Sequence, residues 1–253
     1  MAFELKIHKS KFICGGIAFD KDGTLTDRMA LWRGMFEARS SLIKEELGED
    51  FAVLWAEMTG VDLSARATVD PFGPLAMGNL NQETIVLAAC LYLKLKTPWD
   101  ACLDIAQSLL VRADGTLGPA QLSKPLLGVP EKLIELKSVG VPLALVTMDS
   151  RHNVTRAIAD LGLRGVFDSI VTPDDIQEPK PAPQMLVSAA RQLGVEPSEL
   201  LMIGDTRADV RMAQAAGATC VLVGTDPPKD IESSYISAFI KNLTQIEIVG
   251  ALP

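Results

Sequence analysis

The sequence predicts an α/β fold in which a doubly wound parallel sheet carries helices on both faces. Three observations lead to this prediction. Apolar runs bounded by turn residues recur along the second half of the chain. Helical patterns separate these runs, as the crossover connections between parallel strands require. The runs are continuously apolar, which is typical of strands that are buried on both faces.

The first strand is expected at 12–19 (FICGGIAF). Further strands are expected at 141–148 (VPLALVTM), 169–172 (SIVT), 200–204 (LLMIG) and 219–224 (TCVLVG). A helix is expected before the strand at 141–148, because Pro130 suits a first helical turn and Gly140 suits a C-terminal exit. Helical patterns near 151–161, 182–193 and 207–216 supply the other crossovers.

Residues 27–118 show no convincing strand. Helices are expected near 29–47, 51–59, 82–96 and 98–112, with breaks at Gly48 and at 71–74 (PFGP). We interpret 27–118 as an α-helical domain inserted into a core domain made of 1–26 and 119–253. The alternative is one continuous α/β domain with a long helical crossover.

The insert holds Trp32, Trp55 and Trp99, which we expect in its own core rather than stacked on a substrate. Arg39 lies on its first predicted helix. The same helix carries Arg28 and Arg33, and two interpretations stay open for each of the three arginines. One is contact with a substrate carboxylate or a second phosphate, and the other is a solvated helix face or an ion pair within the insert.

Composition excludes several classes of function. The chain has 253 residues, 48% of them hydrophobic, and a net charge of −8, which argues against a nucleic-acid or anionic-membrane partner. The longest apolar run, 85–93, is too short to cross a bilayer, and the N-terminus has no signal-peptide pattern. Cysteine spacing matches no zinc motif, so we expect reduced, buried thiols in a cytoplasmic protein. The cysteines are Cys14, Cys90, Cys102 and Cys220.

Polar residues follow the ends of the predicted strands. The first strand ends in Asp20 and Asp22, and the second ends in Thr147. Lys180 follows the third strand, and Asp205 and Asp209 follow the fourth. Because sites in open parallel sheets form beyond the carboxyl ends of strands, these groups are expected to converge at one edge.

Crowded carboxylates repel one another unless a cation compensates them. Ligands that are all oxygen favour Mg²⁺, which binds through a few carboxylates together with substrate phosphate. Thr147 and Lys180 would then hold phosphate oxygens. One aspartate remains as a nucleophile and another as a general acid. A simpler alternative for Asp205 and Asp209 is that they cap the helix that starts near 207.

These motifs together resemble the phosphatase branch of the haloacid dehalogenase-like (HAD) superfamily. The matching segments are DKDGTLTD at 20–27, Thr147 after a strand, EPKPAP at 178–183 and GDTRAD at 204–209. The resemblance implies a Rossmann-like core, and the insert is similar to the helical cap of phosphoglycolate phosphatases. It also implies that Asp20 forms an aspartyl-phosphate and that Asp22 acts as acid and then as base.

The resemblance further implies the ligand contacts. Mg²⁺ would bind Asp20, the backbone carbonyl of Asp22, and Asp205, with support from Asp209. Thr147 and Lys180 would bind the phosphoryl group. Gly23 and Thr24 would offer N–H groups to it, and Met148 occupies a substrate-contact position where many relatives carry Asn or Gly.

Lys21 departs from the family, which often has an apolar residue between the two aspartates. We expect its side chain to point away from the chemistry. The predicted reaction is hydrolysis of a small phosphorylated metabolite, such as phosphoglycolate or a sugar phosphate. The alternatives are a phosphomutase of the β-phosphoglucomutase type and a noncatalytic binding protein. Monomer and homodimer both remain open.

Overall fold

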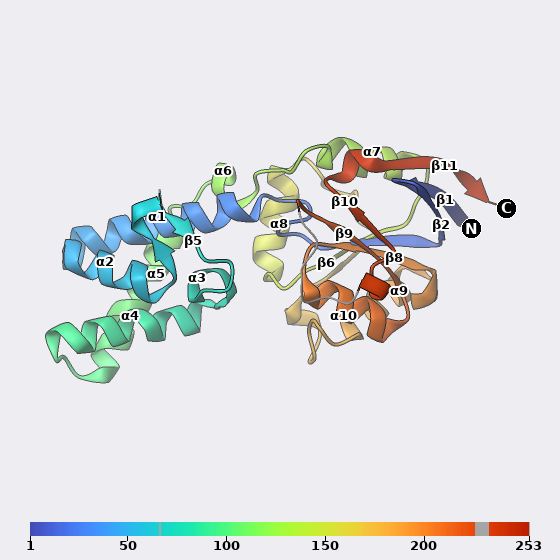
Figure 1. Cartoon of the computed structure of the whole chain (residues 1–253). Helices are drawn as coiled ribbons and strands as arrows, with labels where there is room; N and C mark the ends of the chain where they lie inside the picture. The colour runs from blue at the N-terminus through green and yellow to red at the C-terminus, as the bar shows by residue number, and fades with distance from the viewer. Residues whose placement is uncertain (66, 226–232, 253) are drawn as a thin grey trace. The chain divides into compact units, whose positions relative to one another are not determined.

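The computed structural model describes residues 1–65, 67–225 and 233–252, and within them six strands form one parallel sheet. Their spatial order is β10-β9-β8-β3-β6-β7. Figure 1 labels β6, β8, β9 and β10 of this sheet. The strands are β3 (Gly16–Phe19), β6 (Leu143–Val146), β7 (Ser169–Val171), β8 (Leu200–Gly204), β9 (Thr219–Val223) and β10 (Ala238–Ile240). The predicted α/β fold is confirmed.

The strand order reverses beside β3. From β3 the chain moves outward through β6 to β7, and it then crosses to the other side of β3 for β8, β9 and β10. The pairing places Phe19 of β3 opposite both Leu145 of β6 and Ile203 of β8. Such a reversal is where open α/β sheets form ligand sites, at the carboxyl ends of the strands.

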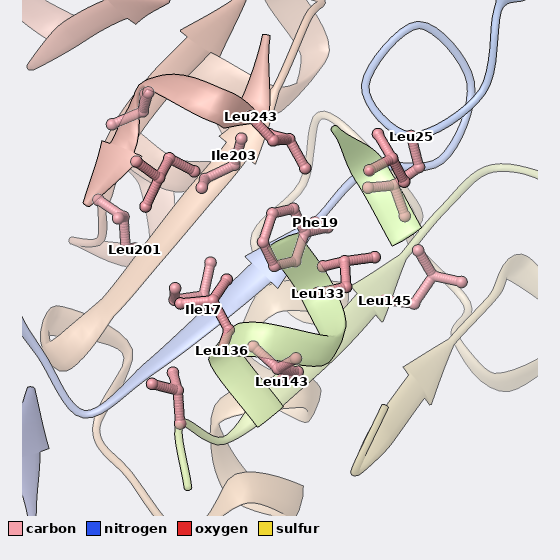
Figure 2. Packing of buried hydrophobic residues seen from close by; sticks show 14 of the residues in the cluster. Ile17, Phe19, Leu25, Leu133, Leu136, Leu143, Leu145, Leu201, Ile203 and Leu243 are labelled. Atoms are coloured by element: carbon pink, nitrogen blue, oxygen red, sulfur yellow. The ribbon is translucent and has the colours of Figure 1, made fainter. Parts of the chain in front are cut away.

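Each face of the sheet is covered by helices because the strands are apolar on both sides. Ile17 and Phe19 lie in one buried cluster with residues of α7 (Val129–Ser138) and α8 (Arg151–Asp160). Figure 2 shows Leu133 of α7 in this cluster with Phe19. Ala18 lies in a second cluster with residues of α9 (Gln184–Leu193) and α10 (Arg207–Ala216). Helices α7 to α10 and strands β6 to β9 fall within a few residues of their predicted positions, whereas β10 was not predicted. One of the predictions is an exception.

The exception is the predicted strand 12–19, which is wrong. It is two strands in different sheets, β2 (Ser10–Cys14) and β3, with a break at Gly15. Strand β2 belongs to an antiparallel sheet of order β11-β1-β2, with β1 (Ala2–Ile7) and β11 (Ile246–Leu252). The break arises where Gly15 N–H turns to the carbonyl of Glu199, at 2.8 Å.

The chain divides into two units. We call Met1–Asp27 with Pro125–Pro253 the core unit, and Arg28–Lys124 the helical unit. Within the core unit, the segments that flank the helical unit are fastened together. Leu126 N–H donates to the Leu25 carbonyl at 2.9 Å, and Thr26 forms an isolated antiparallel bridge with Pro125.

The helical unit is built mainly from four long helices among its described residues. These are α1 (Arg28–Leu47), α2 (Glu49–Met58), α4 (Leu80–Leu95) and α5 (Trp99–Asp114); α3 (Pro74–Met77) and α6 (Pro119–Leu122) are single turns. The expectation of no strand here is wrong, because β4 (Val61–Asp62) pairs with β5 (Thr68–Val69). A two-residue pairing is too short to leave a periodic signal in the sequence.

Trp32 and Trp55 lie in the core of the helical unit as predicted, whereas Trp99 is 44% exposed. The same unit buries an ion cluster. Arg39 donates through Nε and Nη2 to both carboxylate oxygens of Asp114, at 2.6 and 2.7 Å, and it also pairs with Glu83. Burial raises the pKa of Glu83 to about 7, although Arg39 opposes that shift. Arg39 is therefore an ion-pair residue within its own unit.

Short 3₁₀ helices complete the described elements: Leu63–Ala65, Pro173–Asp175, Pro197–Glu199, Ser233–Tyr235 and Leu243–Gln245. All four cysteines are buried and free, as predicted. Among the described residues, no helix combines the length and apolar composition needed to cross a membrane.

Candidate active site

Asp20 stands at the carboxyl end of the central strand β3. Its backbone N–H continues the pairing with β8 by donating to the Ile203 carbonyl at 2.9 Å, so the strand ladder fixes its position. Its carboxylate meets the Lys180 ammonium, with Nζ 2.6 Å from Oδ1. The same ammonium lies 2.7 Å from Oδ1 of Asp209. Lys180 thus bridges two buried carboxylates from different parts of the sheet edge.

Burial dominates the electrostatics of this cluster. It raises the pKa of Asp20 to about 6, because the attraction of Lys180 offsets only part of the desolvation and Asp209 adds repulsion. Burial also works against a charged Lys180, but Asp20 and Asp209 outweigh it and raise the pKa of the ammonium. At Asp209 the attraction of Lys180 and the bonds from Thr206 outweigh burial, so its pKa is lowered. Lys180 and Asp209 are therefore a charged pair.

Asp209 is fixed from both sides. Its Oδ2 accepts hydrogen bonds from the backbone N–H and the hydroxyl of Thr206, at 3.0 and 2.6 Å, while Oδ1 accepts from Lys180. Thr206 in turn caps α10 in a capping box with Asp209. Sequence reasoning missed Thr206, although the spacing Thr-x-x-Asp at 206–209 is a capping signal.

Three carboxylates approach closely enough to share a cation. Asp20, Asp205 and Asp209 each offer one oxygen, and these atoms lie within 4.8 Å of one another. Asp205 follows β8 directly, and Thr24 Oγ1 donates to its Oδ1 at 3.4 Å. A donor set made only of carboxylate oxygens fits a hard divalent cation such as Mg²⁺. Asp209 has both oxygens committed to other donors, so Asp20 and Asp205 are the better direct ligands.

The loop after β3 folds tightly on the Lys21 carbonyl, which accepts from the N–H groups of Leu25 and Thr26 at 2.8 and 2.9 Å. Gly23 occupies the left-handed region, with φ of 94°, and its N–H donates to the Thr26 carbonyl at 2.8 Å. A Cβ at this position would lie 2.1 Å from Oδ2 of Asp205. Gly23 is therefore required both for the turn and for the approach of Asp205.

The structure places Lys21 inside the site, so the expectation that it points away is wrong. Its side chain is 4% exposed, and Nζ lies 2.6 Å from Asp22 Oδ1 and 3.0 Å from Asp149 Oδ2. Burial opposes its charge, but the two carboxylates outweigh burial and raise the pKa of Lys21. Their combined attraction explains why the ammonium turns inward. Thr26, also missed from sequence, donates to the same Asp22 oxygen at 2.8 Å.

Thr147 follows β6, and its backbone N–H donates to the Val171 carbonyl of the neighbouring strand β7 at 3.1 Å. Its hydroxyl oxygen accepts from the Asp149 N–H at 3.2 Å. Ser150 then caps α8 by accepting from the Asn153 N–H. Met148, between these groups, is 50% exposed. Thr147 is 2% exposed, so the strand end buries the threonine and presents the methionine.

The sequence profile of haloacid dehalogenase-like hydrolases matches residues 15–217. The chain belongs to this family. The matched residues run from the core unit through the helical unit and back into the core unit, and they include Asp20, Thr147, Lys180, Asp205 and Asp209.

Two curated relatives of this HAD-like chain are similar over part of their length. Pyrophosphatase PpaX of Bacillus velezensis is 40% identical over 89 residues, which cover 35% of this chain and 41% of that protein. A phosphoglycolate phosphatase of Nitrosococcus oceani is 34% identical over 122 residues, covering 47% and 54%. The matched stretch therefore spans about half the length of these relatives.

A solved structure is similar over nearly the whole chain. It is a HAD family hydrolase of Deinococcus radiodurans, with a TM-score of 0.59, 20% identity, and coverage of 92% of this chain and 93% of that one. At this identity the similarity concerns the fold alone.

Proposed function

We propose that this HAD-like protein is a Mg²⁺-dependent phosphatase that hydrolyses a small phosphorylated metabolite through an aspartyl-phosphate on Asp20. The observation that carries the proposal is the bridge from Lys180 to Asp20 and Asp209, beside Asp205, at the carboxyl edge of the sheet. The names of the two relatives, a phosphoglycolate phosphatase and a pyrophosphatase, support phosphate esters or anhydrides as the substrate class.

In the first step an oxygen of Asp20 attacks phosphorus, and the bond from phosphorus to the leaving oxygen breaks. Lys180 holds Oδ1 of Asp20, so Oδ2 is assigned as the attacking atom. Asp22 gives its proton to the leaving oxygen. The ammonium of Lys180 and the hydroxyl of Thr147 steady the phosphoryl oxygens as charge redistributes.

In the second step a water molecule attacks phosphorus while Asp22 accepts its proton. The bond from phosphorus to Asp20 breaks, which frees inorganic phosphate and restores the carboxylate. Asp22 serves both steps through the oxygen that Lys21 and Thr26 leave available, because they both hold Oδ1.

Asp20, Asp205 and the backbone carbonyl of Asp22 would hold Mg²⁺, with Asp209 supporting the cluster through Lys180 and Thr206. Bound Mg²⁺ supplies positive charge that offsets the phosphoryl oxygens and the carboxylates. Gly23 and Thr24 shape the loop beside these ligands. The proposal includes a cytoplasmic location, supported by four buried, free thiols, and a substrate-selecting cap role for the helical unit.

Phosphate release from a panel of phosphorylated metabolites, with Mg²⁺ and with EDTA, tests the proposal. Release that EDTA abolishes is expected for at least one compound, and Asp20→Asn should reduce it by at least about 10³-fold. The matched control is Asp160→Asn, the same change at the exposed end of α8, which should keep wild-type turnover. No release from any compound, p-nitrophenyl phosphate included, would refute the phosphatase assignment. Interconversion of sugar-phosphate isomers without phosphate release would instead identify a mutase.

A further inference from the structure

Lys21 is a buried cation that neither transfers a proton nor binds the phosphoryl group in the proposed reaction steps. Its ammonium lies between Asp22 Oδ1, at 2.6 Å, and Asp149 Oδ2, at 3.0 Å. These carboxylates come from the loops after β3 and β6, so Lys21 joins two neighbouring strand ends inside the core unit.

The Asp149 end of this link is anchored. Its Oδ1 accepts from the Ser150 N–H and from Nδ2 of Asn153, both at 2.8 Å. Asn153 and the cap residue Ser150 belong to the first turn of α8. The position of Lys21 is therefore set by the start of a helix that packs on the sheet.

The Asp22 end of the link leaves one oxygen available. Oδ1 accepts from both Lys21 Nζ and Thr26 Oγ1, at 2.6 and 2.8 Å. In the described part of the chain, the hydrogen bonds to the Asp22 carboxylate both fall on this oxygen. The Asp22 side chain is 26% exposed, and Oδ2 accepts neither of these two hydrogen bonds.

We propose that Lys21 is a positioning residue that locks the Asp22 carboxylate in one orientation, with Oδ2 directed to the leaving oxygen. This inference rests on the proposed function. A proton donor contributes only when it is held within hydrogen-bond reach of the atom it protonates. Displacement of about 1 Å costs on the order of 10²-fold in rate. The alternative is that Lys21 only neutralises two nearby carboxylates and supports the fold.

The two roles differ in their dependence on the leaving group. An alkyl phosphate needs its leaving oxygen protonated, whereas p-nitrophenolate leaves readily without a proton. Lys21→Met keeps the length of the side chain and removes the ammonium. We expect it to lower kcat/KM by about 10- to 100-fold for an alkyl phosphate, but by less than about threefold for p-nitrophenyl phosphate. The alkyl probe is glycerol 3-phosphate or phosphoglycolate, whichever the wild type hydrolyses faster.

A second signature concerns the later step. Because Asp22 also activates water, Lys21→Met should slow breakdown of the phosphoenzyme and release a burst of p-nitrophenol before steady state. In an Asp22→Ala background, Lys21→Met should change alkyl phosphate turnover by less than about twofold, because the group that it positions is gone. Asp149→Asn weakens the anchor and leaves Lys21 in place, so it should show the same leaving-group pattern to a smaller extent.

Equal losses on both esters, or an additive loss in the double variant, would overturn the positioning role and leave the phosphatase assignment standing. If Lys21→Met does not fold, Asp149→Asn takes its place. The comparison of the two esters and the double variant with Asp22→Ala are then made with Asp149→Asn, and they decide the question. A wild-type protein that hydrolyses no compound of the panel, p-nitrophenyl phosphate included, would refute the proposed function, and the positioning role with it.

Discussion

Lys180 Nζ lies 2.6 Å from Asp20 Oδ1, although 160 positions separate the two residues in the sequence. The contact joins the segment before α9 to the end of β3, and the same ammonium reaches Asp209 at the start of α10. Lys180 therefore connects the end of β3 to the start of α10, which follows β8. Removal of this ammonium leaves the neighbouring carboxylates of Asp20, Asp205 and Asp209 to repel one another.

Lys180→Met should lower the free energy of unfolding by about 3–5 kcal/mol without Mg²⁺, because it leaves buried carboxylates without their cationic partner. Excess Mg²⁺ should recover part of that loss by compensating the same carboxylates, while activity stays at least about 10²-fold below wild type. Urea unfolding with and without Mg²⁺ measures both effects. The control is Lys137→Met, which removes the partly exposed pair with Asp168 and should cost less than about 1 kcal/mol. Equal costs for the two variants would contradict the bridging role of Lys180.

Gly23→Ala should abolish activity, because its Cβ would lie 2.1 Å from Oδ2 of Asp205. Gly140 provides a matched control, since its φ of 87° is close to the 94° of Gly23 but a Cβ there meets no atom within 4 Å. Both variants should lose about 1–2 kcal/mol of stability from left-handed strain. Only Gly23→Ala should also weaken Mg²⁺ binding, measured by calorimetry. Wild-type Mg²⁺ affinity in Gly23→Ala would show that this loop tolerates the side chain.

With p-nitrophenyl phosphate as substrate, Asp22→Ala should trap the covalent intermediate, because p-nitrophenolate leaves without a proton and the carboxylate that activates water is gone. We expect kcat to fall by about 10²- to 10⁴-fold and a phosphorylated protein to accumulate. Intact mass spectrometry after an acid quench detects the added phosphoryl group, and peptide mapping should place it on Asp20. Asp20→Asn is the control and should stay unmodified under the same conditions. Wild-type turnover in Asp22→Ala would remove Asp22 from the acid and base role.

The helical unit should lose stability as the pH rises from about 4.5 to 7. The folded state keeps the Glu83 proton up to a pKa of about 7, whereas the unfolded chain releases it near 4.5. Unfolding therefore becomes easier over this range, by up to about 3 kcal/mol. Trp32, Trp55 and Trp99 all lie in the helical unit, so tryptophan fluorescence during urea unfolding reports on it. Glu83→Gln should flatten the pH dependence, and an unchanged slope would exclude Glu83 as its source.

The strands that the sequence located well are those whose apolar run ends at a turn residue. Residues 200–204 form β8 as predicted, because five buried positions stop at Gly204. The run at 12–19 contains the turn signal Gly15-Gly16, where the two strands separate. Apolar content on either side of it does not record which partner each strand takes. Pairing of β1 with β11 joins residues near opposite ends of the chain, such as Lys6 and Glu247, and no local pattern encodes it.

Site residues divide in the same way. Asp20, Asp205 and Lys180 could be placed together because each follows a strand whose direction was predictable. The orientation of Lys21 could not be, because it depends on Asp22 and Asp149 approaching from two loops. The spacing of Thr206 and Asp209 in the sequence is enough to predict the Thr206 cap. The hydrogen bond from Thr26 to Asp22 depends instead on the folded shape of the loop.

The contacts of Leu25 with Leu126 and of Thr26 with Pro125 hold together the two points of the core unit between which the helical segment is inserted. The core unit receives the outgoing and returning chain at adjacent points, so a segment of different length or sequence can be exchanged there without shifting β3 against β6. The sequence of the inserted segment can therefore change during evolution while Asp20, Asp205, Asp209 and Lys180 keep their positions. Transplanting residues 28–124 from a relative would turn this modularity into a route for altering specificity.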